Sequence, residues 1–497
     1  LRWLWRQLTS MKTALILLFL LALASIPGSI LPQRGTNPIL VEQWITDNPT
    51  LGPIFDSVGL FDVFGSPWYS AVYILLFISL IGCVLPRLGL HWKAMRRPPP
   101  SAPKNLSRFG GGEFEFAGEP EVIIARACAI LKKERWRTVV GHDTHGGHWV
   151  AAEKGYLRET GNLVFHFSLI LILVGVAIGG LFGWRGNVIV REGEGFSNTL
   201  TQYDAWGGGR LSSANSLPEF SFTLESFNVE FERGNAQSGA PRLFEANMVV
   251  DQPGEPASTT HLVEVNQPLV IDAAKVFLVG HGYAPKLIVR DSQGAVVLDD
   301  AVVFLPQDGN FTSTGVIKVP DADPQLGFRG LFLPTTAVDE IRGPHSIFPA
   351  PDDISIFFGA WAGDLGLDDG VPQSIYTLNV EGMTQLGIDP LRIGQTWNLP
   401  EGAGSIEFTG YERWASFQLA YDPGKELALI AAILAIAGLS MSLFVQRRRI
   451  WVKVGEVPGR ISGSRVKVEV AGIAKASGHD ATEQVDRLVE LLKGKVL

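Results

Sequence analysis

Four long runs of apolar residues interrupt an otherwise polar chain, and none of them contains Asp, Glu, Lys or Arg. The runs cover residues 14–31, 69–85, 163–182 and 427–445. Because about 20 helical residues at about 1.5 Å each span roughly 30 Å, each run is long enough to cross a bilayer. The pattern predicts four transmembrane helices, which we place at 13–31, 68–86, 161–183 and 427–445.

The polar stretch between the third and fourth runs has the pattern of a β-rich domain. Apolar residues alternate from Phe220 to Leu224 and again, offset by one position, from Phe227 to Phe231, which predicts a β-bulge. Asp291 to Gly294 has the composition of a hairpin turn. We therefore expect antiparallel sheets over 184–426, arranged as a sandwich or an open barrel, with a last strand that leads directly into the fourth transmembrane helix.

Two shorter stretches have patterns of their own. In 32–67, turn dipeptides alternate with aromatic residues, which indicates short helices at the membrane interface or, equally well, a loop with its own small core. In 87–160, a helical pattern at 122–135 lies between short alternating stretches, so a small α/β segment is expected. No fold is predicted for the tail, 446–497.

Charge is distributed unevenly between these stretches. Residues 1–12, 87–160 and 446–497 hold 27 basic and 14 acidic residues, whereas 32–67 and 184–426 hold 15 basic and 36 acidic residues. Since cytoplasmic segments of membrane proteins retain an excess of Lys and Arg, both termini are predicted to be cytoplasmic and the large domain extracytoplasmic. This arrangement needs the first apolar run to remain as a helix, so we expect it not to be a cleaved signal peptide.

Cysteine usage and missing motifs exclude several classes of protein. The two cysteines, Cys83 and Cys128, both lie outside 184–426, so that domain is expected to fold without disulfides. The chain contains no CxxC and no CxxCH, which argues against a thiol oxidoreductase and against a c-type cytochrome. It also lacks the GxSxG, HExxH and P-loop signatures, and no nucleic-acid-binding pattern is present. A non-catalytic protein is expected.

Most histidines have an ordinary explanation. His142, His145 and His148 are spaced like metal ligands, but no carboxylate or thiol completes a typical set, so solvated histidines in a hairpin turn are expected. His281 and His345 lie in Gly- and Pro-containing stretches that we interpret as loops. Each is expected to be a surface or hydrogen-bonded histidine.

His166 is different because it lies inside the third apolar run. An ionisable side chain there is a functional-site hypothesis by default. The structural alternative is a neutral imidazole that is hydrogen-bonded to Asn162 one turn earlier or to a neighbouring helix. The functional alternatives are a proton relay or a metal ligand, and haem iron is the metal whose flat apolar ring suits a site between membrane helices. The residues alone leave these alternatives open.

Short motifs along residues 8–453 resemble the ResB family of membrane proteins in System II cytochrome c biogenesis. The order and spacing of these motifs, together with four predicted spans, make the resemblance specific. They include Leu8 to Ala14, Ile26 to Ser29, Gly59 to Val63, Gly82 to Arg87, Glu153 to Arg158 with Gly161 and His166, Gly282 to Pro285, and Asp422 to Gly424. The tail beyond residue 453 lies outside the resemblance, and we expect it to be variable and partly disordered.

The resemblance implies a function in haem delivery. A ResB-type subunit with its ResC (CcsA)-type partner would move haem b across the bacterial plasma membrane and present it to apocytochrome c. The resemblance maps the family's haem-associated histidine onto His166, with another axial ligand supplied by the partner. The tryptophan-rich motif that presents haem belongs to the partner, so thioether formation would belong to the complex.

Two other functional classes fit the sequence less well. A membrane-anchored sensor or scaffold would bind a ligand outside and need no haem, but no kinase, HAMP-like or DNA-binding pattern lies in the predicted cytoplasmic segments. An ion-coupled transporter would need more spans and more intramembrane ionisable groups. The basic residues Arg96 and Arg97 next to the second span suit anionic membrane lipid.

Overall fold

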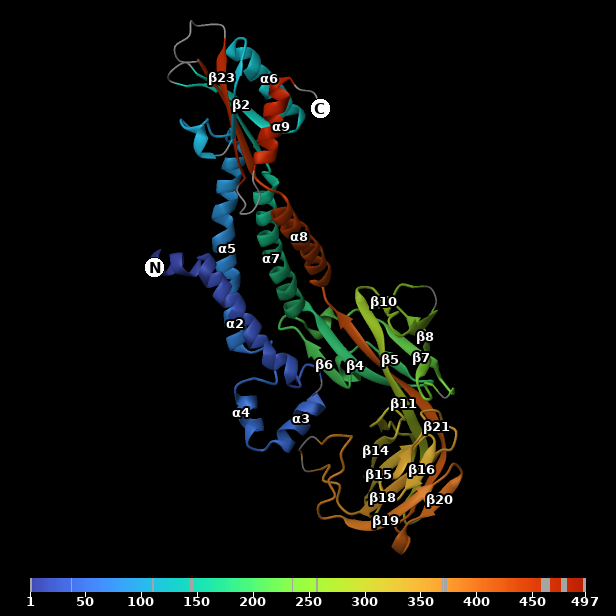
Figure 1. Cartoon of the computed structure of the whole chain (residues 1–497). Coiled ribbons are helices and arrows are strands. Elements are labelled where there is room, and N and C mark those ends of the chain that lie inside the picture. Colours follow the sequence, from blue (N-terminus) through green and yellow to red (C-terminus); the bar gives the residue numbers. More distant parts are fainter. Residues whose placement is uncertain are drawn as a thin grey trace. The chain divides into compact units, whose positions relative to one another are not determined.

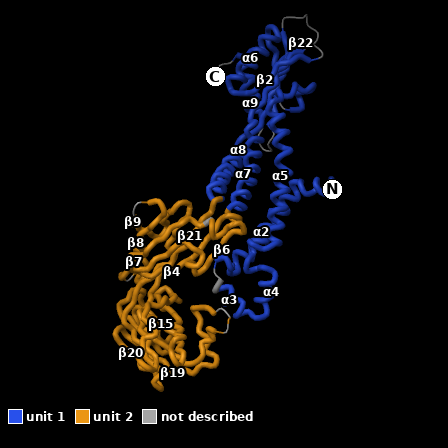
Figure 2. The backbone as a smooth tube through the Cα atoms, turned by 180° about the vertical axis from the view of Figure 1, so that it is seen from behind, with its two compact units in different colours: residues 1–178, 424–497 blue, residues 179–423 orange. Residues whose placement is uncertain are grey.

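The computed structural model describes most of the chain, as two units. Figure 2 distinguishes unit 1, residues 1–178 and 424–497, from unit 2, residues 179–423. The description leaves out residues 1, 37, 110, 144–146, 235, 256–257, 369, 371–372, 457–464, 475–480 and 495–497, and the side chains of 38, 39, 216 and 456.

Unit 1 contains four helices that are long and apolar enough to cross a membrane, which confirms the predicted number. They are α2 (Met11–Ile30), α5 (Pro67–Arg96), α7 (Leu157–Phe182) and α8 (Lys425–Phe444). Ser10 and Ser66 cap α2 and α5 by accepting hydrogen bonds from the backbone N–H three residues later. The second helix, α5, extends ten residues beyond the predicted end at 86, and this extension contains His91.

Small residues allow α7 and α8 to lie side by side (Figure 1). A Cβ atom on Gly161 would lie 2.7 Å from the Gly438 carbonyl oxygen, and one on Gly438 would lie 2.6 Å from the Phe165 nitrogen. At the other end of the pair, a Cβ on Gly175 would lie 2.9 Å from the Gly424 carbonyl oxygen. Such close backbone approach is the usual use of small residues between membrane helices.

Three short helices precede or connect the first two spans: α1 (Arg2–Leu8), α3 (Pro38–Asp47) and α4 (Leu51–Ser57). Between the spans, Trp44 stacks on Phe55 with ring centroids 5.4 Å apart and meets the edge of Phe61 at 5.2 Å. Val41, Phe61 and Val63 are buried. The stretch 32–67 therefore has both short helices and a small core of its own.

The described part of the tail and the predicted α/β segment form one sheet, which corrects the expectation of disorder for these residues. The strand order is β1-β23-β22-β3-β2, and all pairs are antiparallel. The strands are β1 (Gly111–Phe116), β2 (Arg137–His142), β3 (His148–Lys154), β22 (Arg448–Glu456) and β23 (Val466–Ala474). Helices α6 (Pro120–Lys133) and α9 (Thr482–Lys493) share its core, and η1 (Leu106–Phe109) contributes to a second, smaller cluster.

Unit 2 is β-rich, as predicted, and two very long antiparallel strands run through it (Figure 1). These are β11 (Ala274–Arg290) and β21 (Ser405–Tyr421). Their sheet also contains β4 (Trp184–Arg191), β6 (Ala205–Gly208), β10 (Leu269–Ile271), β12 (Val296–Ala301) and β20 (Gln395–Asn398). Because one half of each long strand contributes to one core and the other half to a second core, unit 2 has two lobes.

Each lobe adds a further sheet. The first lobe contains β5 (Gly195–Ser197), β7 (Ser221–Phe231), β8 (Pro241–Asp251) and β9 (Thr259–Glu264). The second contains β13 (Leu305–Pro306), β14 (Ser313–Val319), β15 (Leu326–Leu333), β18 (Ser355–Ala362) and β19 (Thr384–Leu391), with the hairpin β16 (Thr336–Asp339) and β17 (Gly343–Ser346). Single 3-10 turns lie at η2 (Leu200–Gln202), η3 (Ala214–Ser216) and η4 (Pro400–Gly402).

Two local predictions in unit 2 are confirmed. The register of β7 against β8 shifts between Leu224 and Ser226, which is the predicted bulge. The turn from Asp291 to Gly294 joins β11 to β12, and Gly294 has a φ of 83°, a value that favours glycine.

Candidate functional site

His166 lies in the first half of α7, and one of its ring nitrogens has a defined partner. Nδ1 is 2.7 Å from the backbone carbonyl oxygen of Asn162, one turn earlier. Because a carbonyl oxygen can only accept, Nδ1 must carry the hydrogen, and the lone pair of the neutral ring is therefore on Nε2. The bond to Asn162 that the structural alternative required is present, and it also leaves Nε2 in the form that binds a metal.

The surroundings of His166 on the α5 side of α7 are apolar. Ile170 and Leu169, one turn after His166, pack against Leu80 and Val84 of α5. Since positions three and four residues apart share a helix face, His166 belongs to the same stripe. Its side chain is only partly buried. An apolar, partly accessible wall with one imidazole fits a flat apolar ring with a metal at its centre.

A cluster of charged residues holds the first turn of α7 to the α/β sheet of unit 1. Glu153, the last buried residue of β3, accepts hydrogen bonds from Nε of Arg447 at 2.5 Å, from Nε of Arg449 at 2.9 Å and from the Tyr156 hydroxyl. Arg447 also donates to Glu159. Both arginines lie within five residues of the end of α8 at Phe444. This arginine–glutamate cluster (Glu153, Tyr156, Glu159, Arg447, Arg449) therefore joins the ends of two spans.

The electrostatics of the cluster are those of a fixed ion pair. Burial raises the pKa of Glu153, but the hydrogen bonds from Tyr156, Arg447 and Arg449 outweigh it and hold the pKa below the usual value. Burial and the bond to Glu153 raise the pKa of Tyr156 to about 12, so the tyrosine remains a neutral donor. Removing Arg447 or Arg449 would leave the buried carboxylate of Glu153 with less compensating positive charge.

His91, near the end of α5, is brought to the same place. Its Nε2 is 3.1 Å from the Thr160 hydroxyl of α7, and its Nδ1 is 3.8 Å from Oε2 of Glu159. His91 is not among the predicted site residues, because the predicted helix ends at 86. Continuing the apolar spacing of α5 from Leu80 and Val84 for two more turns would have placed residue 91 on the face that meets α7.

The remaining predicted histidines are not brought together with His166. His142 and His148 form a cross-strand pair with ring centroids 4.5 Å apart, and His148 is 3.2 Å from Glu121, while His145 lies outside the described residues. Among the described residues, no group of three or more His, Cys, Asp or Glu side chains is arranged to hold a metal ion. His345 is on β17, not in a loop, and its Nδ1 lies 3.0 Å from the Gly343 carbonyl oxygen.

The expectation that His281 is a loop residue is wrong. It lies in the middle of β11 and is 8% exposed. Its ring stacks on Phe311 at 4.5 Å and is tilted against Phe244 at 5.0 Å and Phe227 at 5.2 Å. Burial, together with the positive charge of Arg413, lowers its pKa to about 4. His281 is thus a neutral core residue.

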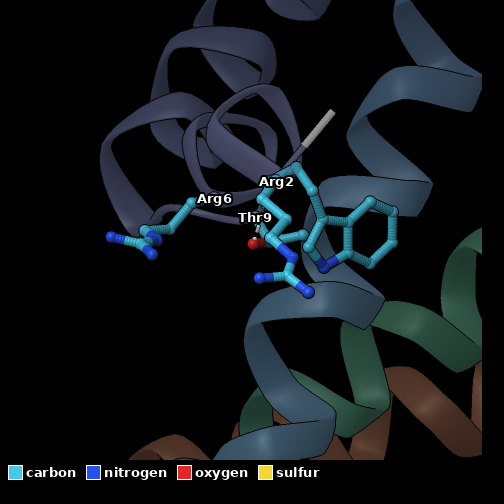
Figure 3. A pocket seen from close by; sticks show the side chains of 4 residues that line it. Arg2, Arg6 and Thr9 are labelled. Atoms are coloured by element: carbon cyan, nitrogen blue, oxygen red, sulfur yellow. Dashed lines mark hydrogen bonds between the residues drawn. The ribbon is translucent and has the colours of Figure 1, made fainter.

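Two open depressions lie elsewhere. One, of about 430 Å³, is lined by Arg2, Trp5, Arg6 and Thr9 of the N-terminal segment (Figure 3). The other, of about 420 Å³, lies on the sheet of the second lobe in unit 2 and includes Arg329 and Tyr376. Neither is lined by a histidine or a cysteine.

Comparison with known proteins identifies relatives over most of the chain. A sequence model of the ResB-like family matches residues 11–486. Cytochrome c biogenesis protein CcsB of Synechococcus sp. (strain CC9311) is 29% identical over 54% of this chain and 58% of that protein. The CcsB protein of Synechococcus sp. (strain JA-2-3B'a(2-13)) is 23% identical over 77% of this chain and 78% of that protein.

The solved structure of cytochrome c heme lyase CcmF aligns with 82% of this chain and 45% of that chain, at 12% identity and a TM-score of 0.23. The chain spans 58% of the length of several curated relatives that it matches. The match to the family model, in contrast, extends through all four apolar helices, the β-rich unit and the α/β sheet. The chain belongs to the ResB-like family.

Proposed function

We propose that this protein is a haem-handling subunit in cytochrome c biogenesis and that His166 binds the haem iron through Nε2. The family membership and the names of the CcsB relatives support the biogenesis role. The observation that carries the ligand assignment is the bond between Nδ1 of His166 and the Asn162 carbonyl oxygen, because it fixes the tautomer and directs the free lone pair away from the helix backbone.

The proposal includes the placement of the chain in the membrane. The four apolar helices cross the bacterial plasma membrane, both termini and the α/β sheet are cytoplasmic, and the β-rich unit 2, built as sandwiches of paired sheets, is extracytoplasmic. The excess of basic residues in 1–12, 87–160 and 446–497 supports this orientation. His166, near the start of α7, would then be close to the cytoplasmic face, where haem arrives.

The site supplies only part of what a bound haem needs. A six-coordinate haem iron requires a second axial ligand. Among the described residues, His166 is not part of any group of three or more His, Cys, Asp or Glu side chains that could hold a metal ion. We therefore propose a half-site that is completed by a ResC/CcsA-type membrane partner, with haem b as cargo. In this scheme the subunit is not itself catalytic, and unit 2 contacts the partner, apocytochrome c, or both.

The test is an absorption spectrum of the full chain, purified alone and after co-expression with its partner. A haem Soret band is expected in the wild type, and His166→Ala should lose most of it. His148→Ala is the matched control, because His148 lies on β3 and pairs with Glu121 rather than with α7. An unchanged band in His166→Ala would overturn the ligand assignment. No band in any preparation would favour a sensor or scaffold without haem.

A further inference from the structure

The cluster beside His166 contains a nitrogen that lacks a good acceptor. The His91 side chain is 12% exposed, and its Nδ1 is fully buried without a hydrogen bond to any described residue. The nearest carboxylate oxygen, Oε2 of Glu159, is 3.8 Å away, which is too far for a hydrogen bond. The Thr160 hydroxyl lies 3.1 Å from Nε2 of His91 and 3.5 Å from the Tyr156 carbonyl oxygen, so Nε2 is the nearer acceptor for its hydrogen. When the hydroxyl donates to Nε2, Nδ1 carries the ring hydrogen and is a buried donor without an acceptor.

Glu159 is the exchangeable acid of the cluster. Arg447 donates to both Glu153 and Glu159, but the Glu153 side chain is 2% exposed whereas that of Glu159 is 37% exposed. Glu153 is also held by Arg449 and Tyr156. A partly exposed ion pair contributes little net stability, so another carboxylate could replace Glu159 at small cost while Glu153 remains in place.

The spacing along α7 connects this position to His166. Glu159 and His166 are seven residues apart, which places them on the same face of the helix, about 10.5 Å apart along its axis. Haem carries its two propionates on one edge of the ring, and a propionate arm reaches a comparable distance from the iron. An iron on His166 would therefore allow a propionate to extend along α7 toward Glu159.

From this geometry we propose that His91 and Arg447 bind a propionate of haem, and that Glu159 is the carboxylate that the propionate replaces. The inference rests on the proposed binding of haem iron by His166. Carboxylate would exchange for carboxylate, so the charge balance around Arg447 is kept. His91 Nδ1 would gain the acceptor that it lacks, and the guanidinium is suited to carboxylate recognition. Together, His91 and Arg447 would set the orientation of the haem ring as it enters the site.

The experiment compares haem with its dimethyl ester, which has the same ring and iron but no free carboxylate. Full-length protein in nanodiscs is titrated with each compound, and binding is followed by the Soret band. The wild type should bind haem several-fold more tightly than the ester. His91→Phe should weaken haem binding by about tenfold and leave ester binding unchanged, as expected for the loss of one charge-assisted hydrogen bond. Glu159→Gln should strengthen haem binding but not ester binding.

Matched controls come from a second His–Glu pair in unit 1. His148 and Glu121 lie 3.2 Å apart on the α/β sheet, so His148→Phe and Glu121→Gln should change neither titration. Equal effects on haem and ester, or no effect of either cluster variant, would overturn the propionate site. If no His166-dependent band forms with either compound, the proposed function itself fails. Glu159→Gln keeps the test decisive should His91→Phe not fold.

Discussion

At the scale of single residues, His281 shows how strongly a core can change a side chain. It is enclosed by phenylalanine rings from both lobes of unit 2, namely Phe227, Phe231 and Phe244 from one and Phe311 from the other. No hydrogen-bond partner for its buried Nε2 is found in the described part of the chain. Charging this ring inside the core is therefore unfavourable.

The depressed pKa of His281 predicts acid sensitivity of unit 2. The folded-state pKa is about 4 and the ordinary value is 6.5, so the unfolded chain binds more protons between these values. The contribution of the neutral His281 ring to the free energy of unfolding is complete well above pH 6.5 and is lost as the pH falls toward 4. Between about pH 7.5 and about pH 5 the loss should be about 2 kcal/mol. Hydrogen exchange of β11 and β21 in the full chain measures it.

The matched variants separate this effect from general acid sensitivity. His281→Phe should remove the pH dependence, because phenylalanine cannot take up a proton and fits the surrounding rings. His261→Phe, on β9 and partly exposed, should retain the full slope. An unchanged slope in His281→Phe would contradict the assignment of the acid sensitivity to this histidine.

The two histidines also show what a sequence can and cannot reveal. His166 could be singled out as a candidate because an ionisable residue within a charge-free run is chemically anomalous. Its hydrogen-bond partner could be anticipated because it lies four residues away on the same helix. The prediction for His281 is wrong because its neighbours Gly280, Gly282 and Pro285 are residue types typical of turns. In the structure, a Cβ on Gly282 would collide with the Trp414 ring, so this glycine makes room for packing within a strand.

At the scale of elements, the close pairing of α7 and α8 is the feature that holds the helix bearing His166. Gly161 and Gly438 allow the two backbones to meet without intervening side chains. The apolar runs alone predicted the four helices. They do not show which helix packs against which, because lipid-facing and helix-facing positions are equally apolar. The extension of α5 was missed for a related reason: Arg137 holds it by donating to the carbonyl oxygens of Met95 and Arg97, contacts from a distant strand.

The pairing predicts a sharp difference between two glycines. Gly161→Ala would place a Cβ 2.7 Å from the Gly438 backbone, so we expect a loss of about 1–3 kcal/mol from overpacking. Gly89→Ala, in the interior of α5 with no atom within 4 Å of the new Cβ, should be neutral or slightly stabilising. Thermal unfolding of the full chain in detergent compares them. Equal midpoints would contradict the close α7–α8 contact.

At the scale of the whole molecule, the segment from β3 through α7 to β4 is the neighbour of the segment from β21 through α8 to β22, and this holds in both units. In unit 1, β3 pairs with β22 and leads into α7, which packs against α8. In unit 2, β4, which follows α7, pairs with β21, which precedes α8. The tail was the largest part of the fold that the sequence analysis missed. Its valines at 466, 468 and 470 alternate as in a strand, but their partner strand β1, about 350 residues earlier, could not be inferred from local pattern.

This arrangement predicts that the tail is essential for the α/β sheet. Val468 is completely buried in β23. Val468→Asp would bury an unpaired charge, at a cost of at least about 3 kcal/mol. Limited proteolysis should then cut the α/β sheet while unit 2 stays resistant. The same substitution at the exposed Val140 of β2 should have little effect, and cleavage of both variants alike would argue against a shared sheet.

The long strand β21 has a consequence for biosynthesis. It lies in the middle of the large sheet, contributes to both cores of unit 2, and comes only at residues 405–421, while β22 and β23 follow it. During translation, the earlier strands of this sheet, such as β4 and β11, therefore have no central partner until β21 has been made. A ribosome that stops short of these strands would release a product with exposed sheet edges, suited to degradation rather than to assembly.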